Sequence, residues 1–153
     1  MPLKSIVFID GNNFYFRLKD LTSKVDGKFS LLDFDYRGFA KSLVKQNELT
    51  GIRYYIGALK RLRGNQKSEK MYADQQKLIA KLQQKQIVIT LGHLIQHPDK
   101  SFHEKGVDVR LAVEMIRFAR EMAYDVAYLL SSDTDLVPAV EEVQSFGKKV
   151  VYV

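Results

Sequence analysis

Four aspartates, Asp10, Asp108, Asp133 and Asp135, stand where apolar segments give way to turns or helices. Carboxylates held close together raise one another's pKa unless a cation or hydrogen-bond donors relieve them. Oxygen ligands suit Mg²⁺ or Mn²⁺, which neutralise phosphate oxygens and lower the pKa of a bound water. Taken singly, Asp133 or Asp135 is better explained as a helix cap and Asp10 as a turn residue. If the fold brings the four together, they predict a metal site for phosphate chemistry.

Other reactive side chains are scarce in this chain. There is no cysteine, which removes thiol nucleophiles, disulfides and cysteine-based zinc sites. The three histidines, His93, His97 and His103, lie in the irregular segment 92–105 and match no metal motif. We therefore assign them no role and expect a solvated loop or hairpin there. Because no Ser-His-Asp arrangement is present either, water is the expected nucleophile.

The segments that would position the acids alternate between strands and helices. Apolar runs predict strands at 3–9, 51–59, 87–91, 125–130 and 149–153, with helical patterns between them. This order predicts an α/β fold with a mostly parallel sheet of about five strands. Strand ends and helix starts share one edge of such a sheet, so the four acids can converge there. A single domain over residues 1–153 is expected, and its end inside the last strand suggests truncation at the C-terminus.

Individual positions near the acids carry further expectations. Asp108 lies in the first turn of a helix on its buried side, where the helix dipole favours its charge. Glu114 falls on the charged face of the same helix, so we expect a surface ion pair rather than a fourth ligand. After the first strand, Gly11 is expected to allow an unusual backbone angle, and Asn12 or Asn13 to cap the next helix.

The positive charge of the chain is concentrated in one stretch. The net charge is +6, and residues 60–85 hold eight basic and two acidic side chains, which accounts for the whole excess. Such a segment could bind a polyanion, although a solvated lysine-rich helix explains the charge at least as well. The candidates for phosphate contacts, called here the basic block, are Arg61, Arg63, Lys67 and Lys70.

The composition is that of an ordinary soluble globular protein, with 46% hydrophobic and 27% charged residues. The N-terminal apolar run is too short for a signal peptide, and no run approaches transmembrane length. These observations predict a cytoplasmic protein that does not associate with membranes.

Three short motifs occur in order along nearly the whole chain. Residues 8–13 read Phe-Ile-Asp-Gly-Asn-Asn, residues 105–108 read Lys-Gly-Val-Asp, and residues 131–135 read Ser-Ser-Asp-Thr-Asp. Together they resemble the Asp-Gly-x-Asn, Lys-Gly-Val-Asp and Ser-Gly-Asp-Ser-Asp motifs of NYN domains in the PIN-like nuclease superfamily, in particular the LabA-like group. In the third motif, Ser132 replaces the usual glycine and Thr134 the usual serine.

The resemblance implies a Rossmann-like three-layer α/β/α sandwich and metal-dependent cleavage of RNA. It implies that Asp10, Asp108, Asp133 and Asp135 are the catalytic metal ligands, with Mg²⁺ or Mn²⁺ as the cofactor. It also implies that Asn13 gives polar support and that Lys105 contacts phosphate. With the basic block, the remaining expected substrate contacts are Ser132 and Thr134.

The resulting hypothesis is a metal-dependent endoribonuclease that hydrolyses single-stranded RNA and leaves a 5′-phosphate and a 3′-hydroxyl. The alternative is an RNA-binding or protein-interaction module with a weak or unused metal site. A phosphatase of the haloacid dehalogenase type is ranked low, because Asn12 stands where its second aspartate is needed. A dinucleotide-binding domain is excluded because no Gly-x-Gly-x-x-Gly follows a strand. A homo-oligomer is left open.

Overall fold

Five apolar segments pair into one sheet in the computed structural model, which describes residues 2–22 and 31–153. Every pairing in this sheet is parallel, and the strand order is β3-β2-β1-β6-β7. The predicted parallel sheet is therefore confirmed. The strands are β1 (Lys4–Asp10), β2 (Glu48–Ile56), β3 (Val88–Leu91), β6 (Val126–Leu130) and β7 (Lys149–Tyr152).

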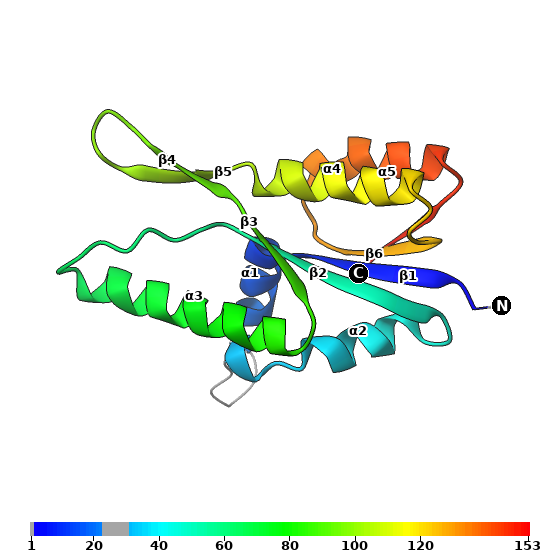
Figure 1. The fold of residues 1–153 in the computed structure, drawn as a ribbon, viewed down its shortest axis with the longest axis horizontal. Helices are drawn as coiled ribbons and strands as arrows, with labels where there is room; N and C mark the ends of the chain where they lie inside the picture. The colour runs from blue at the N-terminus through cyan, green and yellow to red at the C-terminus, as the bar shows by residue number, and fades with distance from the viewer. Residues whose placement is uncertain (1, 23–30) are drawn as a thin grey trace.

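Helices cover both faces of the sheet, with α4 and α5 above it and α2 and α3 below it in Figure 1. This arrangement confirms the predicted three-layer, Rossmann-like α/β/α fold. No helix in the described part of the chain is long and apolar enough to span a membrane. On one face lie α1 (Gly11–Thr22), α2 (Tyr36–Val44) and α3 (Gln66–Gln84), and on the other α4 (Val107–Arg120) and α5 (Val137–Ser145).

The pattern of apolar residues explains why the sheet is buried on both sides. Successive side chains of a strand point to opposite faces. Along β1, Val7 and Ile9 accordingly pack with α1, α2 and α3, whereas Ile6 and Phe8 pack with α4 and α5. All five residues of β6 are buried, as expected of a parallel strand covered by helices on both faces.

The order of the strands creates a switch point at β1. From β1 the chain adds β2 and then β3 on one side, and it later adds β6 and β7 on the other. The connections after β1 and β6 therefore lead to helices on opposite faces of the sheet. A crevice for ligands forms at the carboxyl ends of two such strands.

The histidine-containing segment 92–105 forms a hairpin, which was one of the two structures expected for it. Strands β4 (His93–Gln96) and β5 (Phe102–Lys105) pair antiparallel and form a separate sheet. Figure 1 shows this hairpin projecting beyond the main sheet and leading into α4. Among the side chains that the structure describes, neither His93 nor His97 belongs to a group able to hold a metal.

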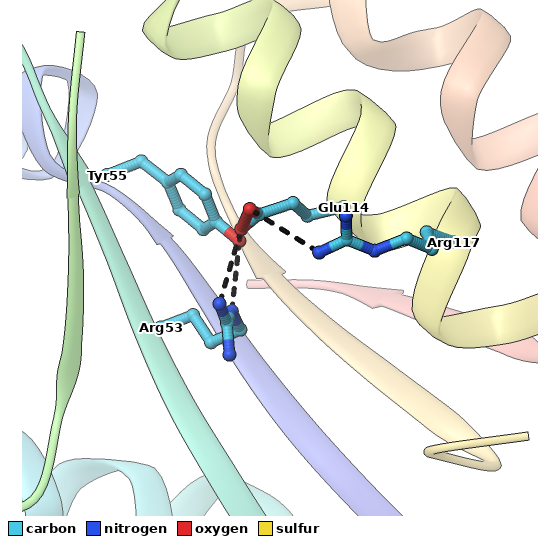
Figure 2. A network of polar contacts seen from close by, with 4 residues as sticks. All are labelled: Arg53, Tyr55, Glu114 and Arg117. Atoms are coloured by element: carbon cyan, nitrogen blue, oxygen red, sulfur yellow. Dashed lines mark hydrogen bonds and ion pairs between the residues drawn. The ribbon is translucent and has the colours of Figure 1, made fainter. Parts of the chain in front are cut away.

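Glu114 is buried inside the protein, so the predicted surface ion pair is wrong. The residue is only 5% exposed. One carboxylate oxygen, Oε1, accepts hydrogen bonds from the Tyr55 hydroxyl at 2.8 Å and from Arg53 Nη2 at 3.3 Å (Figure 2). Its Oε2 lies 3.8 Å from Nη2 of Arg117, three residues further along α4.

This buried network ties β2 to α4. Burial raises the pKa of Tyr55, and the hydrogen bond to Glu114 acts in the same direction, so the tyrosine keeps its proton and remains a donor. The Arg53 guanidinium also lies over the ring of Phe118 on α4, 4.5 Å from its centroid. Asp108 is the second residue of α4, so the network helps to hold in place the helix that carries this aspartate.

Candidate active site

A depression of about 530 Å³ opens at the carboxyl edge of the sheet, where β1 and β6 end. Three separate parts of the chain line it: the start of α1, the turn from β5 into α4, and the segment after β6. The geometry therefore brings together half of the twelve site residues predicted from the sequence. Those that line it are Asp10, Asn13, Lys105, Asp108, Ser132 and Asp133.

Three of the four aspartates form a close group of carboxylates. One oxygen from each of Asp108, Asp133 and Asp135 lies within 4.8 Å of the others. Two oxygens that bind the same Mg²⁺, each at about 2.1 Å, can be at most about 4.2 Å apart. The oxygens of this group are therefore only slightly further apart than oxygens that share a bound Mg²⁺. The donor set is all oxygen, as a hard divalent cation prefers.

The position of Asp108 corrects one expectation. It was predicted on the buried side of its helix, but its neighbour Val107 is buried instead, at 6% exposure, and Asp108 is not in the core. The Asp108 carboxylate accepts a hydrogen bond from the backbone N–H of Val109 at 2.9 Å, which stabilises it in the first turn of α4. The charge consequently remains accessible to a ligand.

Asp10 lies outside the close group but in the same depression, and it is more enclosed. Its Oδ2 accepts a hydrogen bond from the Ser131 hydroxyl at 2.8 Å, and its Oδ1 accepts one from the backbone N–H of Asn13 at 3.3 Å. Burial raises the pKa of Asp10 above its ordinary value, these two bonds oppose the rise, and the charges of Asp133 and Asp108 add to it. A bound cation would relieve both the burial and the repulsion.

The first turn of α1 is built around Asp10 rather than around the asparagines. Because Asp10 itself accepts the N–H of Asn13, it caps the helix, and the predicted capping by Asn12 or Asn13 is wrong. Gly11 does not have a positive φ, so the expected unusual backbone angle is also wrong. A Cβ there would lie 2.7 Å from the Tyr55 carbonyl oxygen, so close approach to β2 is the reason for glycine.

Asn13 and Ser132 hold the two loops of the site together. The Asn13 Nδ2 donates to the Ser132 hydroxyl at 2.9 Å, and the Ser132 N–H donates to Asn13 Oδ1 at 3.2 Å. Ser132 is not among the residues with positive φ in the described chain, so the backbone there does not require glycine. Serine instead of glycine is therefore compatible with the loop, and its hydroxyl is used.

Ser131 connects the acids and was missed in the sequence. It is buried, at 4% exposure, and besides donating to Asp10 it accepts the N–H of Asp133 at 3.1 Å. Asp133 in turn accepts the N–H of Asp135 at 2.9 Å. The position of Ser131, as the first hydroxyl residue after a fully apolar strand, was the signal in the sequence that could have identified it. A continuous series of hydrogen bonds thus runs from the Asp10 carboxylate through Ser131 to Asp133 and the backbone of Asp135, while Asp108 lies outside it.

The turn from β5 into α4 depends on a glycine. Gly106 has φ of 90° and ψ of −1°, the left-handed conformation, and it immediately precedes α4. A Cβ at this position would lie 3.9 Å from the nearest side chain, so backbone conformation and not space requires glycine here. This turn places the exposed Lys105 and Asp108 at the same depression.

The basic block is not brought to the acids. All four of its side chains are exposed, none lines the depression, and Arg61 lies 3.5 Å from Glu69 in an ion pair. Lys67 instead lines a second, smaller depression of about 260 Å³ at the start of α3. Thr134 is exposed in a short 3-10 turn, Thr134–Leu136, and does not line the acidic depression either. Of the basic side chains predicted to contact phosphate, Lys105 is therefore the one that lines the acidic depression.

The fold and the site together define an α/β domain with a carboxylate cluster at a topological switch point, the class to which PIN-like nucleases belong. A family model for the NYN domain matches residues 4–153, and the chain belongs to the NYN domain family, whose members are generally nucleases. Searches of the curated proteins and of the solved structures found no match. The family model does not distinguish the LabA-like group, which stays a prediction.

Proposed function

We propose that this NYN domain is a Mg²⁺- or Mn²⁺-dependent endoribonuclease that hydrolyses single-stranded RNA. The observation that carries the proposal is the approach of three carboxylates to within 4.8 Å, two of which, Asp108 and Asp133, line the same depression as Asp10 and Lys105. Together these groups offer ligands for a cation and an ammonium for a phosphate, which a phosphodiester substrate requires.

The donor set fits a divalent cation, with Asp108, Asp133 and Asp135 as its ligands and Asp10 beside them. When bound, such an ion neutralises phosphate charge and lowers the pKa of a water that attacks phosphorus. Its affinity should be weak, because none of the three carboxylates is buried and Mg²⁺ keeps several of its waters.

The other residues of the site bind the substrate and orient the attacking water. The exposed ammonium of Lys105 contacts a phosphate oxygen of the substrate. One of Asp133 and Asp135 accepts the proton of the attacking water, and the hydrogen bonds through Ser131 hold these acids in place. Because the chain has no cysteine and no histidine in a recognisable catalytic motif, cleavage is hydrolytic and leaves a 5′-phosphate and a 3′-hydroxyl.

End-group analysis of a labelled single-stranded RNA tests this proposal. Asp108→Asn and Asp133→Asn should each lose cleavage by orders of magnitude in Mn²⁺, with circular dichroism unchanged. Glu141→Gln, which removes an exposed carboxylate on α5 outside the depression, is the matched control and should keep full activity.

Two results would overturn the mechanism. Products that end in a 2′,3′-cyclic phosphate would show that the ribose hydroxyl attacks, and cleavage that persists in EDTA would show that no divalent ion is needed. Binding of RNA without cleavage in either Mg²⁺ or Mn²⁺ would favour the alternative of a binding module.

A further inference from the structure

An exposed aromatic ring borders the acidic depression. Phe16 is 65% exposed, although it belongs to a helix that packs on the sheet. The buried side of α1 is formed by Phe14, which is 7% exposed, with Leu18 packed against the same core. Phe16 is two residues after Phe14, which corresponds to about 200° around a helix. Its side chain is therefore on the face of α1 opposite to the buried side. Packing of α1 therefore does not account for a large apolar side chain at this position.

The ring of Phe16 is part of the same depression as the carboxylates. Phe16 and Asn12 are four residues apart, hence neighbours on one helix face, and both line the depression with Asp10 and Lys105. The neighbouring Tyr15 is 41% exposed, and its ring meets that of Phe16 edge to face, with centroids 5.6 Å apart and planes at 70°. This contact supports the Phe16 ring from one side.

We propose that Phe16 is a stacking platform for the nucleobase next to the cleaved phosphodiester, so that the site requires an unpaired nucleotide there. The inference rests on the proposed function and identifies the part of the substrate that the site recognises. A base stacked on the ring leaves its own phosphate close to Lys105 and to the carboxylate group that would hold the cation.

The chemistry of the depression favours a nucleotide over an apolar protein segment. An apolar side chain set on Phe16 would also cover carboxylates and an ammonium, which lose solvation without gaining partners. A nucleotide has a flat aromatic face for the ring and an anionic phosphate for the charged groups. Stacking is tolerant of sequence because every base has such a face, so little base preference is expected. Duplex RNA should bind poorly, since its bases are covered by their neighbours.

Tryptophan fluorescence can observe this contact directly. The protein has no tryptophan, so Phe16→Trp introduces a single reporter at the site. The experiment uses Asp108→Asn as the background, which prevents cleavage during the titration. The probes are a short single-stranded oligoadenylate RNA and an abasic ribose-phosphate strand of the same length. Phe146→Trp is the matched control, because Phe146 is 40% exposed at the far end of α5, on the opposite edge of the sheet.

Oligoadenylate should quench the fluorescence of the tryptophan at position 16 until the site is saturated, and the abasic strand should not. The fluorescence of the tryptophan at position 146 should change with neither probe. In the same background, Phe16→Ala should raise the Kd for oligoadenylate by about 5- to 150-fold, the range for loss of one base–aromatic stack, and leave the abasic strand unaffected. Phe16→Tyr keeps the ring and should retain the affinity. Equal quenching by both probes, or an unchanged Kd in Phe16→Ala, would overturn the stacking platform.

The failures of the two proposals are distinguishable. If the unsubstituted protein cleaves single-stranded RNA but Phe16→Ala leaves KM and the Kd unaltered, the nuclease proposal stands and the stacking proposal is wrong. If oligoadenylate quenches position 16 as expected but the unsubstituted protein never cleaves RNA in Mn²⁺, stacking stands and the nuclease proposal is wrong.

Discussion

Removing the Glu114 carboxylate should destabilise the protein by about 3 kcal/mol. In Glu114→Ala, the buried Tyr55 hydroxyl loses the acceptor that it contacts at 2.8 Å, and Arg53 loses its carboxylate partner at 3.3 Å. Breaking a buried ion pair by deleting one member costs about 3–5 kcal/mol. The lower end applies, because the Arg53 side chain is 22% exposed and regains some hydration. For a domain of this size, the expected fall in Tm is roughly 6–12 °C.

Glu114→Gln separates charge from shape. Glutamine keeps an oxygen that can accept from Tyr55 and has nearly the same volume, so its cost should be only about 1–2 kcal/mol. A double-mutant cycle with Tyr55→Phe should give a coupling of about 1 kcal/mol, as expected for residues in direct contact. Urea unfolding followed by circular dichroism measures these values, with a changed midpoint and an unchanged m-value.

Glu121→Gln is the matched control, since Glu121 is an exposed acid at the end of the same helix. It should change stability by less than about 0.5 kcal/mol. If Glu114→Ala costs no more than this control, the carboxylate is solvated and the conclusion that it anchors α4 to β2 is refuted.

Other substitutions test the site and its supports. Burial holds the pKa of Asp10 above its ordinary value of 3.8, so the folded protein loses stability as pH rises from about 3.8 through the raised pKa, and loses no more above it. Without metal, the stability of Asp10→Asn relative to wild type should therefore increase with pH over this interval and then level off, as urea midpoints would show, and a difference independent of pH would contradict this. Gly11→Ala should cost about 1–3 kcal/mol through collision with Tyr55, whereas Gly51→Ala, with its nearest atom at 3.9 Å, should fold normally in thermal melts. Gly106→Ala should cost about 1–2 kcal/mol for its left-handed backbone, and Gly106→Asn less, because asparagine tolerates that conformation. Because the basic block lies outside the depression, replacing all four of its side chains by glutamine should leave the Kd for single-stranded RNA and its salt dependence nearly unchanged; a Kd raised alike for all sequences, with a smaller salt dependence, would show that the block binds the strand beyond the depression.

The sequence by itself determined the class of fold and the edge at which the acids gather. The apolar run of β6 and the alternation of strands with helices are local features, and parallel strands necessarily place their carboxyl ends together. From this alone Asp10 and Asp133 could be expected at one edge. The three motifs that resemble NYN domains added Asn13 and Lys105, both of which line the depression.

Only the tertiary structure decided which of these groups touch and which stay apart. Glu114 has the helical spacing of a surface acid, but its partner Arg53 is 61 residues away on β2, and no local pattern shows that pairing. Charge likewise marked the basic block without revealing that it lies away from the depression. Gly11 is required by the backbone of β2, and Phe16 is exposed because α1 packs through Phe14. Each of these depends on contacts between distant segments, which exist only once the strand order and the helix faces are set.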